Sequence, residues 1–153
     1  MKTLEQIKSD LESQTKSSVT IEGTAITLQK ENLLQVAQFL KSNSDYQMDY
    51  LANLTATDFK DYIEVVYHIY SIAKREGPIT LKTKTDRAKA LVPSVTPVWR
   101  GAEFQEREVY DLLGVHFEHH PDLRRILMWE GFEHYPLRKD YVIEDQDRET
   151  AAF

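Results

Sequence analysis

The segment EREVYDLLG, residues 106–114, has the pattern of an amphipathic helix that ends at a glycine, yet it places a carboxylate among apolar residues. A helix turns by about 100° per residue, so Glu106 falls on the apolar side of a helix that we predict from about Val98 to Leu113. A buried carboxylate needs a cation, hydrogen-bond donors or a proton, because an unpaired buried charge is costly. The apolar residues predicted on the same side are Trp99, Ala102, Val109, Tyr110 and Leu113.

The cations available to this carboxylate include two arginines further along the chain. We hypothesise that Glu106, or Glu108 beside it, pairs with Arg124 or Arg125. An arginine suits this role because a guanidinium tolerates burial better than an ammonium. The simpler alternative is that the helix is rotated, or that the Glu106 side chain extends into solvent.

The same helix carries charges of alternating sign along one edge. Glu103, Arg107 and Asp111 are four residues apart, a spacing at which opposite charges stabilise an exposed helix by a few tenths of a kcal/mol per pair. This pattern therefore indicates helix stabilisation whatever the function.

The segment HFEHHP, residues 116–121, holds four side chains that could bind a metal. His116 and Glu118 would point one way from an extended chain and His119 another, and no second ligand pair follows at a recognised spacing. A small histidine metalloprotein that uses these residues is therefore an alternative. We expect His120, which precedes Pro121, to be a turn residue that hydrogen-bonds the chain after it.

The composition and motifs of the chain exclude several classes of catalytic and cofactor site. The 153 residues are 41% hydrophobic, which predicts one compact domain. The absence of cysteine excludes disulfides, iron–sulfur clusters, thiolate zinc sites and cysteine nucleophiles in this chain. No serine stands in a hydrolase motif, and no glycine-rich phosphate loop is present.

The charge and hydropathy patterns bear on partners. From Trp99 to Phe153 there are 7 Lys and Arg against 13 Asp and Glu, which argues against a nucleic-acid interface. No apolar run is long enough to span a membrane. The N-terminus has neither a signal core nor a presequence pattern, so we expect a chain without a membrane span.

The order of elements predicts an α+β fold, a two-layer sandwich of helices on a mixed sheet of about five strands. A third helix and an extended C-terminal arm follow. We place a strand at Tyr62–Ala73 in the centre of the sheet, and one at Gly77–Asp86, whose lysines would guard an edge. The other predicted elements are helices Thr3–Thr15 and Glu31–Ser42, and strands Ser18–Glu22, Thr24–Gln29 and Met48–Leu54.

Three segments divide the chain. Residues 1–117 are predicted to form the α+β domain with the third helix. Residues 118–143, punctuated by Pro121, Gly131 and Pro136, are predicted to be an extended partner-binding arm, because such a backbone cannot satisfy its own polar groups. Residues 144–153 are an acidic tail that we expect to be frayed.

Three ordered motifs in the last third are specific. EREVYDLLGVHF (Glu106–Phe117), HPDLRRIL (His120–Leu127) and PLRKDY (Pro136–Tyr141) closely resemble the signature of the C-subunit of proton-pumping NADH:quinone oxidoreductase, respiratory complex I. Upstream segments at 54–59, 65–68 and 91–97 are also similar, so the resemblance covers most of the chain. The chain departs from the family at Phe104, where a tryptophan is frequent, and at 133–135, where a small residue is common.

The resemblance implies a cofactor-free subunit in the peripheral arm of the complex, with no catalytic residue of its own. Its partners would be the quinone-module subunit that resembles the large subunit of nickel–iron hydrogenases, and other peripheral subunits. FMN, iron–sulfur clusters and quinone would belong to those partners. The location implied is the cytoplasmic side of a bacterial inner membrane, or a thylakoid-type membrane, with no direct span.

The motif residues divide into two predicted sets. The structural ion pairs are assigned to Glu106, Arg107, Glu108, Asp111, Arg124 and Arg125, and the partner interface to His120, Pro121, Asp122, Pro136, Leu137, Arg138, Lys139 and Asp140. We expect Arg138 and Lys139 to face the partner. Because the same family serves membrane-bound nickel–iron hydrogenases and formate hydrogenlyases, a subunit of such a complex is an alternative, and a stand-alone binding module is a third.

Overall fold

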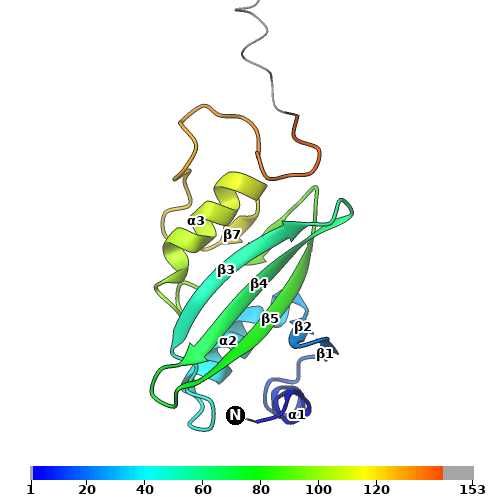
Figure 1. The fold of residues 1–153 in the computed structure, drawn as a ribbon, viewed down its shortest axis with the longest axis vertical. Helices are drawn as coiled ribbons and strands as arrows, with labels where there is room; N and C mark the ends of the chain where they lie inside the picture. The colour runs from blue at the N-terminus through cyan, green and yellow to red at the C-terminus, as the bar shows by residue number, and fades with distance from the viewer. Residues whose placement is uncertain (1, 143–153) are drawn as a thin grey trace, which may run out of the picture.

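The computed structural model describes residues 2–142, and it has the two layers that the sequence predicts (Figure 1). A five-stranded sheet forms one layer and helices form the other. The helices are α1 (Leu4–Thr15), the short 3-10 helix η1 (Lys30–Asn32), α2 (Leu33–Ser42) and α3 (Ala102–Leu113). The strands are β1 (Val19–Glu22), β2 (Ala25–Leu28), β3 (Tyr50–Asp58), β4 (Tyr62–Ser71), β5 (Glu76–Asp86), β6 (Leu91–Pro93) and β7 (His116–Glu118).

The main sheet has the strand order β1-β2-β5-β4-β3. The sheet is mixed, because β2 and β5 are parallel while the other three strand pairs are antiparallel. The prediction that β4 lies inside the sheet is confirmed, since it pairs with β5 and with β3, although the middle strand of the five is β5. The edge position predicted for β5 is wrong, since β5 lies between β2 and β4. Its lysines mark an open face of the sheet: Lys82 pairs with Glu64 at 2.8 Å, and Lys84 lies 3.4 Å from Glu22.

Short sequence patterns account for the helices and strands of the N-terminal half. Thr3 caps α1, where its hydroxyl accepts from the Gln6 amide and the Gln6 side chain accepts from the Thr3 amide. The inward face of α1 then carries Ile7 and Leu11, both fully buried. The two strands predicted on either side of Gly23, β1 and β2, form an antiparallel hairpin, and the φ of 62° at Gly23 suits the turn. The buried face of α2 is made by Leu33, Val36, Ala37 and Leu40.

A small parallel pair of strands, β6 and β7, was not predicted. The two strands have three residues each, too short for a clear sequence pattern. Their pairing brings the end of β7 beside the 94–97 loop, because the Ser94 amide donates to the Glu118 carbonyl. The third helix also begins later than predicted, at Ala102, after a turn in which the Val98 and Trp99 amides donate to the Val95 carbonyl.

The C-terminal arm, described through residue 142, contains no helix or strand from residue 119 onward. Figure 1 shows it passing from β7 over the C-terminal end of α3 toward the turn between β3 and β4. Within residues 2–142, no helix is both long and apolar enough to cross a membrane. The predicted acidic tail, residues 144–153, lies outside the described residues.

Candidate functional site

Asp111 fixes the first part of the arm to α3. Its fully buried carboxylate accepts from three consecutive backbone amides, Ile126 at 3.0 Å, Leu127 at 2.6 Å and Met128 at 2.8 Å. Burial opposes ionisation of this carboxyl, but the three amides and Arg125 outweigh it and hold its pKa below the usual range. Asp111 is therefore a charged acceptor that satisfies an irregular piece of backbone.

Arg125 connects the same point to the next bend of the arm. It donates to the Asp111 carboxylate at 2.7 Å and to the Asp111 carbonyl at 3.0 Å, and it reaches the His134 carbonyl at 3.1 Å. Its guanidinium also lies over the rings of Phe132 and Tyr135, at 5.6 and 5.4 Å from their centroids. One arginine thus holds residues 132–135 against the end of α3.

Arg107 serves the arm rather than the predicted charge ladder. Its guanidinium donates to the carbonyls of Arg124 at 3.1 Å and Arg125 at 3.3 Å, and only 7% of the residue is exposed. Asp122 is its nearest carboxylate, at 4.0 Å. The ladder fails because Arg107 and Asp111 are buried beneath the arm, where backbone groups that have lost water need partners.

Asp58 binds the far end of the arm. This buried carboxylate, at the end of β3, accepts from Arg87 at 2.9 and 3.0 Å and from the Lys139 amide at 2.9 Å. Arg87 in turn donates to Asp140 at 2.6 Å. The Arg87 hydrogen bonds hold the pKa of Asp58 well below its usual range. Sequence reasoning missed both Asp58 and Arg87, and the only signal was Asp58 at the end of an upstream family segment.

The PLRKD motif has an inward and an outward side. Arg138, predicted to face the partner, instead donates to the Leu113 carbonyl at 2.7 Å and lies over the Tyr135 ring. The Leu137 side chain points out and is 60% exposed. Lys139 is also exposed, with its ammonium 5.8 Å from the centre of the Phe59 ring. The assignment of this motif to a partner interface stays a prediction.

Glu106 is completely buried, as helical geometry predicts, but the hypothesis that it pairs with an arginine is wrong for the described residues. It accepts from the Ser94 hydroxyl and the Val95 amide, each at 2.7 Å. Burial raises its pKa to about 7, against the effect of these two donors. The arginines predicted for Glu106 and Glu108 contact other carboxylates: Arg124 pairs with Asp122 at 2.8 Å, and Arg125 with Asp111.

His120 is the turn residue that the sequence predicts. The Asp122 amide lies 3.0 Å from Nδ1, and an N–H can only donate there, so Nδ1 accepts and the proton is on Nε2. Nε2 then donates to the Glu103 carbonyl at 2.9 Å and lies 4.0 Å from the Glu106 carboxylate. His120 therefore joins the start of the arm to α3. Within residues 2–142 no group of three or more potential metal ligands is assembled.

Large apolar side chains gather on the outward side of the arm. Five are exposed on the arm: Ile126, Leu127, Trp129, Leu137 and Val142. Phe104 on α3 is 60% exposed as well. Concentration of such residues on one irregular segment is typical of a protein–protein contact. We name the arm side chains Ile126, Leu127, Trp129 and Leu137 the outer surface.

Comparison with known proteins identifies the family of the chain. Residues 26–147 match a family described as the respiratory-chain NADH dehydrogenase, 30 Kd subunit. The NADH-quinone oxidoreductase C-subunit 2 of Rhizobium meliloti is 40% identical over 122 residues, which cover 78% of this chain and 66% of the relative. The corresponding C-subunit of Geobacter sulfurreducens is 40% identical over 128 residues, which cover 81% and 77%.

Solved structures agree on the fold. A chain of the membrane-bound sulfane sulfur reductase, an archaeal respiratory membrane complex, superposes with a TM-score of 0.71 at 24% identity, covering 97% of this chain and 91% of its own. That likeness is one of fold alone. A trypsin-resistant fragment of Nqo5, residues 1–134, gives a TM-score of 0.54 at 26% identity, covering 78% of this chain and 98% of the fragment.

Proposed function

The chain belongs to the family of the respiratory-chain NADH dehydrogenase 30 Kd subunit, and on that premise we propose that it is a non-catalytic subunit of an NADH-quinone oxidoreductase. Its role there is to bind partner subunits, so that they assemble into the part of the enzyme that passes electrons from NADH to quinone. The names of its relatives, which are C-subunits of NADH-quinone oxidoreductases, support this assignment over the hydrogenase alternative.

One observation carries the binding role: side chains of the domain bond to backbone groups of the arm, while several large apolar side chains of the arm face outward. Asp111 and Asp58 accept from arm amides, and Arg107 donates to arm carbonyls. Beside these contacts, Leu127 and Trp129 are 60% and 62% exposed. Because these contacts already fix the backbone of the arm, binding of a partner costs less backbone conformational entropy than it would for a mobile segment.

The electron-transfer groups belong to the partners in this proposal. The chain has no cysteine with which to hold an iron–sulfur cluster, and the family resemblance assigns FMN, the clusters and quinone to other subunits. The partner that we propose for the outer surface is the quinone-module subunit resembling a hydrogenase large subunit. The chain would lie at the membrane periphery through that contact.

Purification from source membranes tests the assignment. An affinity-tagged chain is expected to bring down a multi-subunit assembly that contains flavin and iron and oxidises NADH with a quinone. Recovery of the chain alone would contradict the proposal. Recovery of a nickel-containing assembly without flavin would assign the chain to a hydrogenase instead.

A further inference from the structure

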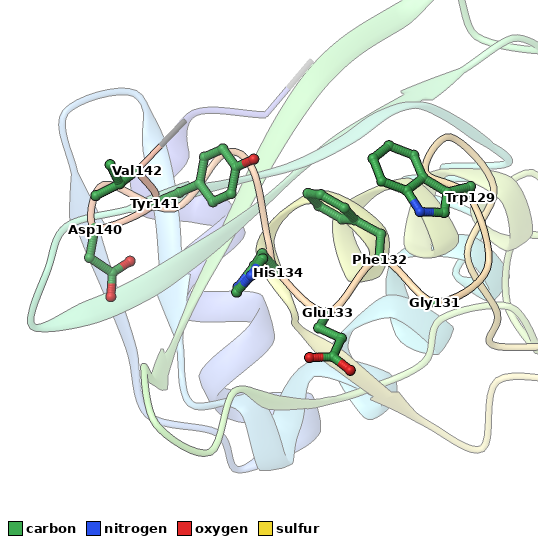
Figure 2. A pocket seen from close by; sticks show the side chains of 8 residues that line it. All are labelled: Trp129, Gly131, Phe132, Glu133, His134, Asp140, Tyr141 and Val142. Carbon is green, nitrogen blue, oxygen red and sulfur yellow. The ribbon is translucent and has the colours of Figure 1, made fainter. Parts of the chain in front are cut away.

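A pocket of about 610 Å³ opens near the end of the arm, between residues 129–134 and residues 140–142 (Figure 2). Of its lining residues, Phe132 and His134 contact Arg125, and Asp140 pairs with Arg87, from outside the lining. Four of its lining side chains are rings, Trp129, Phe132, His134 and Tyr141, and two are carboxylates, Glu133 and Asp140. Rings and acids thus surround one open space on the arm.

The rings contact one another around Phe132. Its centroid lies 4.7 Å from that of Trp129, 5.9 Å from His134 and 6.2 Å from Tyr141, and each pair is close to edge-to-face. In such pairs ring faces remain available to a third group, and a ring face attracts a cation. Trp129 is 62% exposed, which is unusual for the side chain that offers the strongest ring face.

The charged side chains that line the pocket have one sign. In Figure 2 the Glu133 carboxylate lies below the rings, and the Asp140 carboxylate lies at the left of the view. Asp140 is paired with Arg87, whereas Glu133 is exposed and makes no ion pair with any described residue. No lysine or arginine lines the pocket among residues 2–142. Ring faces beside an uncompensated carboxylate therefore form a site for a cation rather than for an apolar or anionic group.

We propose that this pocket receives an arginine side chain of a partner subunit. A guanidinium is flat enough to stack on a ring while it pairs with a carboxylate. The arm already holds one of its own arginines in this way, since Arg125 lies 5.6 Å from the centre of the Phe132 ring while it pairs with Asp111. The identity of the donor as a partner subunit rests on the proposed function.

The recognition itself is tested on the full chain by NMR. Nα-acetyl-arginine amide is titrated against the labelled protein, with its neutral isostere Nα-acetyl-citrulline amide as the matched ligand. We expect the arginine probe to bind at least about five-fold more tightly, and to shift the Trp129 indole N–H together with the amides of residues 131–134. Equal binding of the two probes, or binding elsewhere, overturns the proposal.

Two variants of equal charge change locate the carboxylate. Glu133→Gln is expected to weaken binding of the arginine probe several-fold, whereas Glu130→Gln, which lies outside the lining, leaves it unchanged. If both variants lose the same affinity, only the general acidity of the region matters and the site is refuted. A gain of affinity in Arg148→Gln would show that this chain's own arginine competes for the pocket, which would overturn the partner assignment.

The assembled enzyme tests the source of the arginine. Glu133→Gln is expected to release partner subunits at a lower salt concentration than Glu130→Gln does. Equal retention would overturn the inference while leaving the proposed function intact, because that function depends on the outer surface. Recovery of the chain without any partner subunits would instead count against the proposed function.

Discussion

Asp111 and Arg125 form an ion pair of 2.7 Å in which the carboxylate is fully buried and the guanidinium is 17% exposed. The pair joins the C-terminal end of α3 to an arm that has no regular structure of its own. The remaining oxygen of Asp111 accepts from three successive arm amides. Carboxylates thus accept from the amides of the arm, and Arg107 donates to its carbonyls, so that side chains take the place of a neighbouring strand.

Asp111→Asn is expected to destabilise the protein by about 2 to 3 kcal/mol, because a buried charge loses its partner and the amides lose a charged acceptor. Urea unfolding measures the change. Hydrogen exchange should show the largest acceleration at the amides of residues 126–128. Asp122→Asn, which removes the exposed pair with Arg124 and the 4.0 Å contact with Arg107, is the control and should have little effect. Equal effects of the two variants would contradict the assigned role.

Glu106 predicts a pH dependence of stability. Its pKa is about 7 in the folded protein against an ordinary value of 4.5, so the folded state binds the proton more tightly and stability falls as pH rises through this window. The loss is at most about 3 kcal/mol. Glu106→Gln should abolish it, since glutamine resembles the protonated acid. Asp58 and Asp111 have lowered pKa values and would contribute only below this window.

Denaturant titrations at pH 5 and pH 8 check this expectation. They are made on the wild type, on Glu106→Gln and on the control variant Glu108→Gln. The exposed Glu108→Gln is the control and should retain the pH dependence of the wild type. A wild type that gains stability between these two values relative to Glu106→Gln would contradict the role assigned to the buried carboxyl.

Much of this architecture was predictable, and the exceptions have physical reasons. The α1 cap follows from the residues at the helix start. The burial of Glu106 and the interior position of β4 follow from the periodic spacing of apolar residues along a helix or a strand. The partners of Glu106 were not predictable, since Ser94 and Val95 are positioned by the β6–β7 pairing. The position of β5 was predicted wrongly because lysines on one side of a strand occur both at the edge of a sheet and on a solvent-exposed face of an interior strand.

Arg87→Met should free the far end of the arm while leaving the rest folded, because Arg87 bridges Asp58 and Asp140. Limited trypsin digestion is then expected to cleave after Arg138 or Lys139 several-fold faster than in wild type. Lys84→Met removes an exposed lysine of the open sheet face and is the control. Unchanged cleavage in Arg87→Met would show that the bridge does not hold the arm.

Gly114→Ala should destabilise the protein by more than its backbone strain alone. Gly114 has a φ of 72°, and a Cβ there would lie 2.5 Å from the Tyr135 ring of the arm. Gly23 has a similar φ of 62° with open space around it, so Gly23→Ala measures the strain by itself, about 1 kcal/mol. Thermal unfolding of both variants gives the difference. Equal losses would mean that the arm is not packed on the helix end.

The binding role of the outer surface is tested most directly by one pair of variants in the source organism. Leu127→Asp and Ile72→Asp place the same charge on side chains that are 60% and 63% exposed, one on the arm and one on the turn after β4. The measured quantity is the amount of assembled NADH-quinone oxidoreductase in membranes, by native electrophoresis and activity. We predict that Leu127→Asp abolishes or strongly reduces assembly while Ile72→Asp does not. Normal assembly in Leu127→Asp, with the protein folded and present, would contradict the central claim.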